Sequence, residues 1–368
     1  MGSYSYVKLG DISEVITKGT TAKKFLNDGV AFIKIESINS RTTLGNKLSY
    51  ISEEEHKTYL KRSVLKEGDI LFSIAGALGI VHIVQKEELP ANTNQALSII
   101  RLKQKEKIEY VSWFLETPSI KKMILELKSI GAQPNLSLEQ ISNIKIPMLS
   151  SNKLEHIVVE LLNTIEKRIE TQNKIIEELQ SLRKAIYYEQ IKGAKKEEMM
   201  ISDICDIGRG RVISQQEIAK QNNPIYPVFS SQTLNNGIMG YLDNYDFDGE
   251  YVTWTTDGAN AGTVFYHNGK FNCTNVCGTL KTNSEKVIPY YLFLALSHEA
   301  KRYVSTNLGN PKLMNGTMAK IKIKVPSIVV QKTVVNGSMI LDRLIDIETK
   351  ILNALSSQKS YFLANLFI

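Results

Sequence analysis

An internal repeat constrains the fold of this chain more than any other feature of its sequence. The segment LGDISEVITKG (Leu9 to Gly19) returns as ISDICDIGRG (Ile201 to Gly210). Each copy opens a longer stretch that ends in a β-like run, a proline and a helix with regularly spaced apolar residues. A repeat offset of about half the chain length predicts two tandem modules of one architecture.

Landmark residues keep the same order in both copies of the repeat. The pairs are Asp11 and Asp203, Gly68 and Gly249, Asn94 and Asn275, and Pro147 and Pro326, and the offset within a pair shrinks slowly along the chain. Surface loops tolerate changes of length and core elements do not, so this drift predicts loop deletions in the second copy. The copies differ most at 20–65 against 212–247. Two copies that share their landmark residues but differ in the segments between them favour two different specificities on one fold.

Composition limits the classes of protein that this chain can belong to. Its 368 residues, 43% of them hydrophobic, are enough for two or three domains with cores of their own. A net charge of +7 gives mild support for an acidic partner, nucleic acid first and an anionic membrane second. Cys205, Cys273 and Cys277 form no C-x-x-C pair, which predicts reduced thiols and no metal site. No signal peptide or membrane-spanning run is present, so we expect a soluble cytoplasmic protein.

Both modules show β-rich segments followed by helical ones. In the first, strand-like runs at 31–38, 69–84 and 96–103 precede helical segments at 110–116 and 120–130 and a closing strand at 144–147. The second repeats this order with strands at 250–266 and 278–282, helices at 290–297 and 299–305, and a closing strand at 321–326. The pattern predicts a mostly β domain with appended helices in each copy.

Each module is followed by a stretch with the apolar periodicity of a coiled coil. The predicted seam of the first stretch consists of Leu154, Val158, Leu161, Ile165, Ile175, Leu179, Leu182 and Ile186, with Arg168 and Gln172 as polar members. The second contains Val330, Val334, Leu341, Leu344, Ile351, Leu355 and Phe362, with Glu348 and Gln358 as polar members. We expect the two helices to pair antiparallel and to act as a spacer about 50 Å long. The alternative is a long helix that only closes one domain's core.

The sequence contains no recognisable catalytic constellation. Its five histidines are scattered, and the zinc-protease, serine-hydrolase and Walker patterns are missing. NPIY (Asn223 to Tyr226) is similar to the substrate loop of DNA amino-methyltransferases but has isoleucine in place of the second proline. IAGALG (Ile74 to Gly79) imitates a phosphate loop but lacks its lysine. We interpret NPIY as a turn before a strand.

Several segments together resemble the specificity subunits of type I restriction-modification systems. In the first copy these are LGDISEVITKG, GDILFSIAGALG (Gly68 to Gly79) and NTNQAL (Asn92 to Leu97). In the second they are ISDICDIGRG, YPVFSSQTLNNGIMGY (Tyr226 to Tyr241), GEYVTWTTDGANAGTVFY (Gly249 to Tyr266) and CTNVCGTL (Cys273 to Leu280). The resemblance covers the whole chain, and the second set is the more specific.

The resemblance implies an α+β fold with two tandem mostly-β target-recognition domains separated by two long helices packed as an antiparallel coiled coil. The expected boundaries are 1–150 and 196–326 for the recognition domains, and 151–195 and 327–368 for the central and C-terminal helical regions. The implied function is non-catalytic: each domain reads one half of a bipartite, asymmetric DNA target, and the coiled coil sets the spacer. The implied partners are double-stranded DNA, two methyltransferase subunits and motor-nuclease subunits, with no cofactor.

Polar and basic residues of turn-rich segments are the candidates for DNA contact, because base edges are read by side-chain donors and acceptors while cations hold the phosphates. In the first module they are Lys18, Lys23, Lys24, Arg41, Ser73, Asn92, Asn94 and Gln95. In the second they are Arg209, Arg211, Ser230, Ser231, Gln232, Asn235, Asn236, Trp254, Thr255, Asp257 and Asn260. Two rival functions stay open, a stand-alone DNA methyltransferase and a protein scaffold that binds no DNA.

Overall fold

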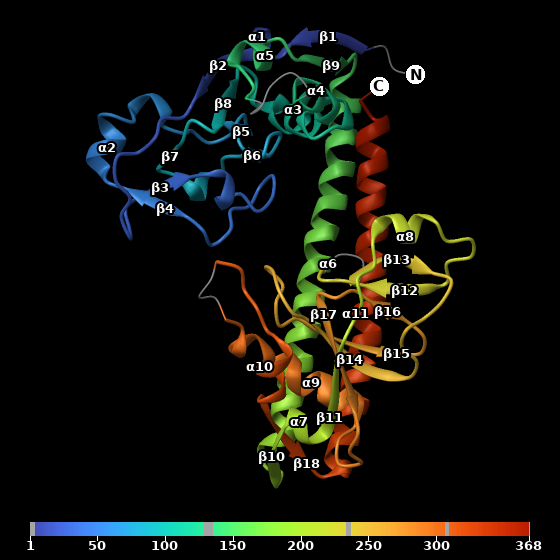
Figure 1. The fold of residues 1–368 in the computed structure, drawn as a ribbon. Coiled ribbons are helices and arrows are strands. Elements are labelled where there is room, and N and C mark those ends of the chain that lie inside the picture. The colour runs from blue at the N-terminus through green and yellow to red at the C-terminus, as the bar shows by residue number, and fades with distance from the viewer. Residues whose placement is uncertain (1–3, 129–134, 233–236, 306–308, 368) are drawn as a thin grey trace. The chain divides into compact units, whose positions relative to one another are not determined.

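The computed structural model describes residues 4–128, 135–232, 237–305 and 309–367 (Figure 1). The chain divides into two compact units, residues 1–173 with 350–368, and residues 174–349. Each unit combines one β-rich module with part of both long helices, α6 (Asn152–Lys192) and α11 (Ile328–Asn365). The expected α+β class with two β-rich domains and two long paired helices is confirmed. None of the described helices has the length and apolar content needed to cross a membrane.

The first module forms three small sheets, with strand orders β2-β8-β5-β6, β4-β3-β7 and β1-β9. Its elements are β1 (Tyr4–Lys8), α1 (Leu9–Ile12), β2 (Ser13–Lys18), β3 (Val30–Ile33), η1 (Ile35–Ser37), β4 (Ser49–Ile51), α2 (Glu53–Lys57), η2 (Lys61–Ser63), β5 (Ile70–Ser73), β6 (Val81–Ile83), η3 (Lys86–Glu88), β7 (Ala91–Thr93), β8 (Leu97–Leu102), η4 (Lys105–Lys107), α3 (Ile108–Leu115), α4 (Pro118–Lys128), α5 (Leu138–Ser142) and β9 (Lys145–Leu149).

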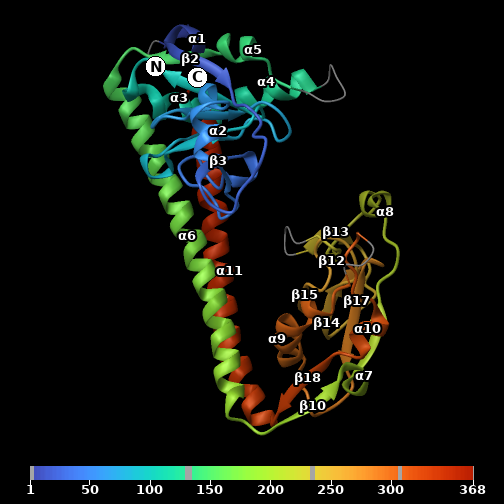
Figure 2. The same ribbon diagram turned by 90° about the vertical axis from the view of Figure 1, so that its left-hand side faces the viewer.

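The second module repeats this topology, with strand orders β11-β17-β14-β15, β13-β12-β16 and β10-β18 (Figure 2). Its elements are β10 (Lys196–Met200), α7 (Ile201–Ile204), β11 (Cys205–Arg209), α8 (Gln215–Ala219), β12 (Tyr226–Phe229), β13 (Ile238–Leu242), β14 (Glu250–Thr255), β15 (Val264–Asn268), β16 (Asn272–Cys273), β17 (Cys277–Thr282), α9 (Pro289–Glu299), η6 (Ala300–Tyr303), α10 (Asn315–Ala319) and β18 (Lys322–Pro326).

The long helices complete the core of each module. In the first unit, Leu162 of α6 and Leu363 of α11 belong to the same buried cluster as Trp113 of α3. In the second, Tyr187 of α6 and Val334 of α11 belong to the cluster of Trp254. The largest apolar cluster of each module therefore includes residues of both long helices, whereas smaller clusters, such as those of Phe32 and Phe271, contain strand and loop residues of the module alone.

Strand pairing fixes the register of the repeat and corrects three of the landmark pairs. Ile70 and Val252 face equivalent residues of the central strand, so Gly68 matches Glu250 instead of Gly249. Ser98 pairs with Lys18 and Gly278 pairs with Arg209, so Ser98 of β8 corresponds to Gly278 of β17, and the same register matches Asn94 to Thr274 instead of Asn275. The Tyr110 hydroxyl donates to the carbonyl of Pro147, and the Tyr291 hydroxyl donates to that of Lys324. Pro147 therefore matches Lys324 and not Pro326.

The seam of the helix pair differs from the prediction at every second position. Burial assigns Val158, Ile165, Gln172, Leu179 and Ile186 to the seam of α6 as predicted, but the positions between them shift by one residue toward the C-terminus. The observed intermediate residues are Glu155, Leu162, Ile169, Ile176, Arg183 and Gln190. The predicted Leu154, Ile175 and Leu182 are exposed by 42%, 36% and 48%.

The helix α11 shows the same correction. Val334, Leu341, Glu348, Leu355 and Phe362 lie in its seam as predicted, whereas Leu344 and Ile351 are 40% exposed. The intermediate seam residues are Gln331, Ser338, Ile345, Leu352, Lys359 and Leu366. Every seam position of α11 follows its counterpart in α6 at one constant offset, the one that relates Val158 to Val334. The two helices are thus equivalent parts of the repeat.

Charged residues enter the seam because they pair with each other there. In the first unit the Lys359 ammonium lies 2.7 Å from a carboxylate oxygen of Glu166. In the second unit the Arg183 guanidinium binds the Asp342 carboxylate. At the constant helix offset Arg183 matches Lys359 and Asp342 matches Glu166, so one ion pair occurs twice. A search for apolar periodicity cannot find a seam that contains such pairs.

The corrected seam predicts opposite costs for two leucines on the same helix. Leu162→Ala should reduce the free energy of unfolding by about 2–4 kcal/mol, because it leaves a cavity in a closed core. Leu154→Ala should cost less than about 1 kcal/mol, because its side chain is already largely in water. Urea unfolding of both variants measures the difference. Equal losses of unfolding free energy in the two variants would support the seam predicted from the sequence.

Candidate nucleic-acid interface

The first strand of each large sheet ends in an exposed basic residue followed by a glycine. Lys18 ends β2 before Gly19, and Arg209 ends β11 before Gly210. A Cβ atom at Gly19 would lie 2.1 Å from the carbonyl oxygen of Asn94, and one at Gly210 would lie 2.2 Å from that of Cys273. Only glycine permits so close an approach of two backbones. The basic side chain therefore lies beside the loop that follows β7 in the first module and beside the loop that follows β16 in the second.

In the second module several loops meet at this edge. The Arg209 guanidinium donates to the carbonyl of Asn275 (2.6 Å) and to the Thr256 hydroxyl (3.1 Å). Asp257 and Gly258 form the next turn, where the Gly258 amide donates to the Pro311 carbonyl at 3.0 Å. The Asn260 side-chain amide donates to the Ser231 carbonyl at 3.3 Å. The structure thus brings Arg209, Asp257, Asn260 and Ser231 together on neighbouring loops.

The first module presents a simpler edge. Gln95 is exposed in the loop beside Gly19, and the Asn94 side chain accepts a hydrogen bond from the Ala96 amide at 3.1 Å, which fixes the turn. Lys23 and Lys24 are exposed in the loop after β2, and the Lys23 ammonium lies 4.5 Å from the centre of the Tyr59 ring. Lys18, Lys23, Lys24 and Gln95 are therefore accessible from solvent.

Some residues of the predicted set have buried side chains that take part in contacts within the module. They are Arg41, Ser73, Asn92, Trp254 and Thr255, all less than 5% exposed. The Ser73 hydroxyl closes the turn of IAGALG by donating to the Ala77 carbonyl and accepting from the Ile80 amide. Asn92 binds the Leu60 carbonyl, and the Trp254 indole donates to the Leu313 carbonyl. These five side chains are therefore inaccessible from solvent in this structure.

Other predicted contacts are occupied within the protein. Arg211 binds the carboxylates of Glu217 and Asp246, and the hydrogen bond that its guanidinium donates to Glu217 raises the pKa of Arg211. Ser230, Ser231 and Gln232 are half-buried, and the Gln232 side chain donates to the Ile238 carbonyl. Asn235 and Asn236 lie outside the described residues. Arg211 carries its neutralising charges with it, so it adds little positive potential.

Two exposed cations at the same edges escaped the sequence analysis. Arg62 donates to the Thr20 hydroxyl at 3.4 Å, next to Gly19. Lys312 pairs with Asp257 across an isolated bridge between backbones. Neither residue lies in a repeated segment, so only the folded backbone brings them to the edge.

The three cysteines are free and buried, as the absence of a paired motif predicts. Burial raises the pKa of the Cys205 thiol to about 12 and that of the Cys277 thiol to about 11. These values keep both thiols protonated and unreactive near neutral pH. They are core side chains.

Comparison with known proteins identifies the family to which this chain belongs. The family model described as type I restriction modification DNA specificity domain matches residues 1–181 and 194–357. The chain belongs to this family. It is the DNA specificity subunit of a type I restriction-modification system, the non-catalytic component that confers specificity.

Curated relatives from Mycoplasma pneumoniae match part of the chain. A type I specificity subunit N-terminus is 52% identical over 135 residues, 36% of this chain and 71% of the relative. The specificity subunit of the type I restriction enzyme MpnII is 40% identical over 149 residues, 40% of this chain and 44% of the relative.

Solved structures match the fold over the whole chain. The S subunit of a type I system from M. genitalium superimposes with a TM-score of 0.62 at 16% identity, covering 100% of this chain and 96% of that one. A chain from a study of complex assembly and conformational transition in a type I system gives a TM-score of 0.52 at 13% identity, covering 100% and 97%. At these identities the likeness establishes the fold.

The close approach at Gly210 predicts a sharp steric effect. Gly210→Ala should lower the free energy of unfolding by more than about 2 kcal/mol, because the new methyl group meets backbone and not a flexible side chain. Gly193→Ala is the matched control, since nothing lies within 4 Å of its Cβ position. Thermal or urea unfolding compares the two variants. A Gly210→Ala protein as stable as the control would contradict the assigned packing.

Proposed function

We propose that each module of this specificity subunit reads one half of a bipartite, asymmetric DNA target. The observation that carries the proposal is the edge that both modules share, a basic residue followed by a closely packed glycine at Lys18–Gly19 and Arg209–Gly210. Loops on a rigid β frame are suited to base reading because their side chains vary while the frame stays fixed. Different loop residues at matched places would give two different half-sites.

The proposed DNA contacts are residues of these edges whose side chains are exposed or half-buried. Cations hold phosphates and amides or carboxylates read base edges. In the first module the proposed residues are Lys18, Lys23, Lys24, Asn94 and Gln95, with Arg62 added. In the second they are Arg209, Ser230, Ser231, Gln232, Asp257 and Asn260, with Lys312 added.

The helix pair is proposed to set the spacer between the half-sites and to hold the partner subunits. Both helices are continuous, with 41 and 38 residues, and their seams alternate by three and four without interruption. The implied partners are two methyltransferase subunits, one for each module, and motor-nuclease subunits; the subunit itself needs no cofactor. Exposed charges of α6, such as Lys167, Lys174 and Glu177, are available to such partners.

A stand-alone methyltransferase is less well supported. Its candidate substrate loop, NPIY, enters β12, and the amides of Asn222 and Asn223 donate to the carboxylate of Asp243. The segment is therefore a turn tied to a neighbouring loop. Binding of a methyl-donor cofactor to the isolated chain would support this rival, and a DNA affinity insensitive to salt would support the scaffold.

Exchange of one module tests whether each module reads its own half-site. Replacing residues 200–326 with the second module of another such subunit should change one half-site and leave the other, because the first module is untouched. Methylation-site sequencing in cells that carry the methyltransferase subunits gives both half-sites at once. The matched control exchanges the module for its own sequence with synonymous codons. A change in both halves would contradict modular reading.

The heptad seam predicts how the spacer should respond to helix length. Inserting seven residues in both helices, after Asn173 and after Thr349, keeps the seam in register and lengthens the pair by ~10 Å, about three base pairs. The same sequencing should find both half-sites unchanged and a spacer longer by about that number. A four-residue insertion in α6 alone serves as the register-breaking control. If the seven-residue variant kept the original spacer, the helix pair would not set the spacer length.

A further inference from the structure

The second module holds the guanidinium of Arg209 in one fixed orientation. Arg209 ends β11 at an exposed position, and two nitrogens of its guanidinium donate hydrogen bonds within the module. Nε donates to the carbonyl of Asn275 at 2.6 Å, and Nη2 donates to the hydroxyl of Thr256 at 3.1 Å. These two nitrogens form one side of the planar group. Two bonds to one side fix both the position and the plane of the guanidinium.

The threonine that accepts from Arg209 is itself held in place. The Thr256 side chain is buried, and its hydroxyl donates to the carbonyl of Val276 at 3.0 Å. That bond uses the hydroxyl hydrogen and leaves the oxygen lone pairs to accept from Arg209. The backbone carbonyl of Thr256 accepts from the amide of Leu313 at 2.8 Å. Thr256 therefore offers its oxygen to the guanidinium from a rigid position.

The outer edge of the Arg209 guanidinium keeps free donors. The two bonds use one N–H group at Nε and one at Nη2, which leaves the N–H groups of Nη1 and the second one of Nη2. Within the described residues no carboxylate forms an ion pair with Arg209, whereas two carboxylates bind Arg211. Arg209 thus keeps its charge and presents two parallel N–H donors, one from each Nη nitrogen.

Two parallel donors fit the edge of one particular base. In the major groove guanine presents O6 and N7 as neighbouring acceptors, whereas adenine places a donor beside N7. Cytosine and thymine each offer a single polar group there. A phosphate also accepts from a guanidinium, but its oxygens accept from many directions, so a flexible cation serves as well. The fixed plane of Arg209 therefore favours guanine over a phosphate.

The first module has a lysine at the equivalent place. Lys18 pairs with Ser98 as Arg209 pairs with Gly278, so both residues end the first strand of their sheet at the same position. Within the described residues the Lys18 ammonium has no hydrogen-bond or ion-pair partner. An ammonium is a point charge and has no planar fork to match two acceptors. The two edges therefore share a charge and differ in the geometry that presents it.

The residue that holds Arg209 differs between the modules as well. Thr256 corresponds to Ile74, since its amide donates to the carbonyl of Val276 as the amide of Ile74 donates to that of Ala96. The side chain of Ile74 is apolar and offers no acceptor to a cation. Arginine thus occurs with a hydroxyl in one module, and lysine with an apolar side chain in the other. This paired difference is expected if the hydroxyl serves the arginine.

We propose that Arg209 reads a guanine in the half-site of the second module through the free edge formed by Nη1 and Nη2. Thr256 is the positioning residue, which holds the guanidinium in the plane of the base. The inference rests on the proposed function, in which the second module reads one half-site of the DNA target.

Arg209→Lys keeps the charge and removes the planar fork. In cells that carry the methyltransferase subunits, methylation-site sequencing of the unmodified chain should find a fixed G·C pair in one half-site. The preference for that pair is the ratio of methylation at sites with it to methylation at sites with another pair there. Arg209→Lys should lower this ratio about tenfold or more and leave every other position unchanged, because only the bidentate contact is lost.

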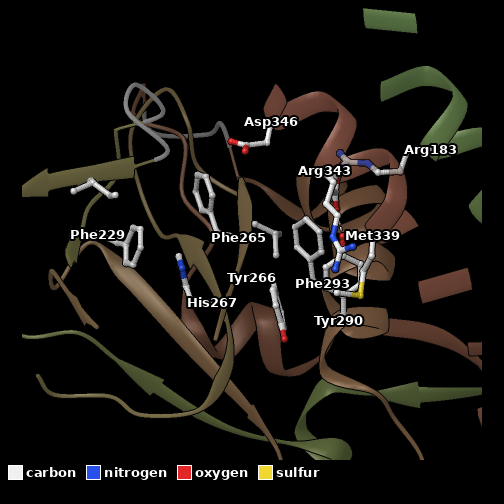
Figure 3. A pocket seen from close by; sticks show the side chains of 13 residues that line it. Arg183, Phe229, Phe265, Tyr266, His267, Tyr290, Phe293, Met339, Arg343 and Asp346 are labelled. Atoms are coloured by element: carbon white, nitrogen blue, oxygen red, sulfur yellow. Dashed lines mark hydrogen bonds and ion pairs between the residues drawn. The ribbon is translucent and has the colours of Figure 1, made fainter. Parts of the chain in front are cut away.

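Arg343→Lys is the matched control. Arg343 is an exposed arginine of the same unit, and Figure 3 shows it beside Phe293 at the wall of a hollow. Neither Arg209 nor Thr256 lines that hollow. Arg343→Lys should therefore leave both half-sites as they are in the unmodified chain.

Two substitutions of Thr256 test its positioning role. Thr256→Val keeps the shape of the side chain and removes the hydroxyl, so it should lower the same G·C preference about threefold or more. Thr256→Ser keeps the hydroxyl and should retain the preference, which would not follow if the threonine served packing alone. Thermal unfolding of both variants shows whether the fold is kept, and Arg209→Lys tests the inference without any change in the core.

Several results would overturn the inference. A uniform loss of methylation in Arg209→Lys with the G·C preference kept would assign the residue a phosphate. An unchanged preference in Arg209→Lys, or equal preferences in Thr256→Val and Thr256→Ser, would contradict base reading or positioning. Exchange of residues 200–326 separates these failures from failure of the proposed function. If the exchange changes one half-site alone while Arg209→Lys keeps the G·C preference, only the assignment of Arg209 is wrong.

Discussion

The packing of α6 against α11 is the interaction on which the rest of each unit depends. The largest apolar cluster of each β-rich module contains residues of these helices: Leu162 belongs to the cluster of Trp113, and Val334 to that of Tyr291. An ion pair that recurs at the same place of both repeats, Lys359 with Glu166 and Arg183 with Asp342, sits in the seam of each unit. Because the helices are part of both cores, a change in their register would disturb the modules as well as their connection.

The sequence alone predicted the repeat, the fold class and the alternating members of the seam. It misplaced the intermediate seam positions because Leu154, Ile175 and Leu182 look more apolar than Glu155 and Arg183, which the helices bury or half-bury. Burial of Glu155 depends on the Lys107 ammonium, which the chain supplies from η4. Such compensation between distant residues leaves no periodic signal. The pairing of Pro147 with Pro326 was wrong for a similar reason. The two prolines agree in residue type, but the equivalent of Pro147 is Lys324, whose carbonyl accepts the corresponding tyrosine hydrogen bond.

In the candidate site, too, residue type alone predicts which side chains could contact DNA, but only the fold determines which of them are exposed. Lys18 and Arg209 were predicted as basic residues at matching positions of turn-rich segments, and both lie at an exposed edge of their module. Arg41 and Asn92 have the side chains of DNA-reading residues, yet they lie inside the first module. Arg41 finds its aromatic partner in Trp113, and the two are too far apart in sequence for any local pattern to connect them.

Divergence between the modules therefore serves more than one purpose. The region 20–65 differs most from its counterpart and was expected to carry specificity, but residues 39–43 within it anchor the sheet edge to α3 and α6. Among its described residues the counterpart region forms α8, β12 and β13, and within the described part of the chain no backbone hydrogen bond reaches the amide of Tyr266 on the outer side of β15. Within the described residues, the duplicated fold thus covers the outward amide of the edge strand with its own turn in one copy and gives the equivalent amide no backbone partner in the other.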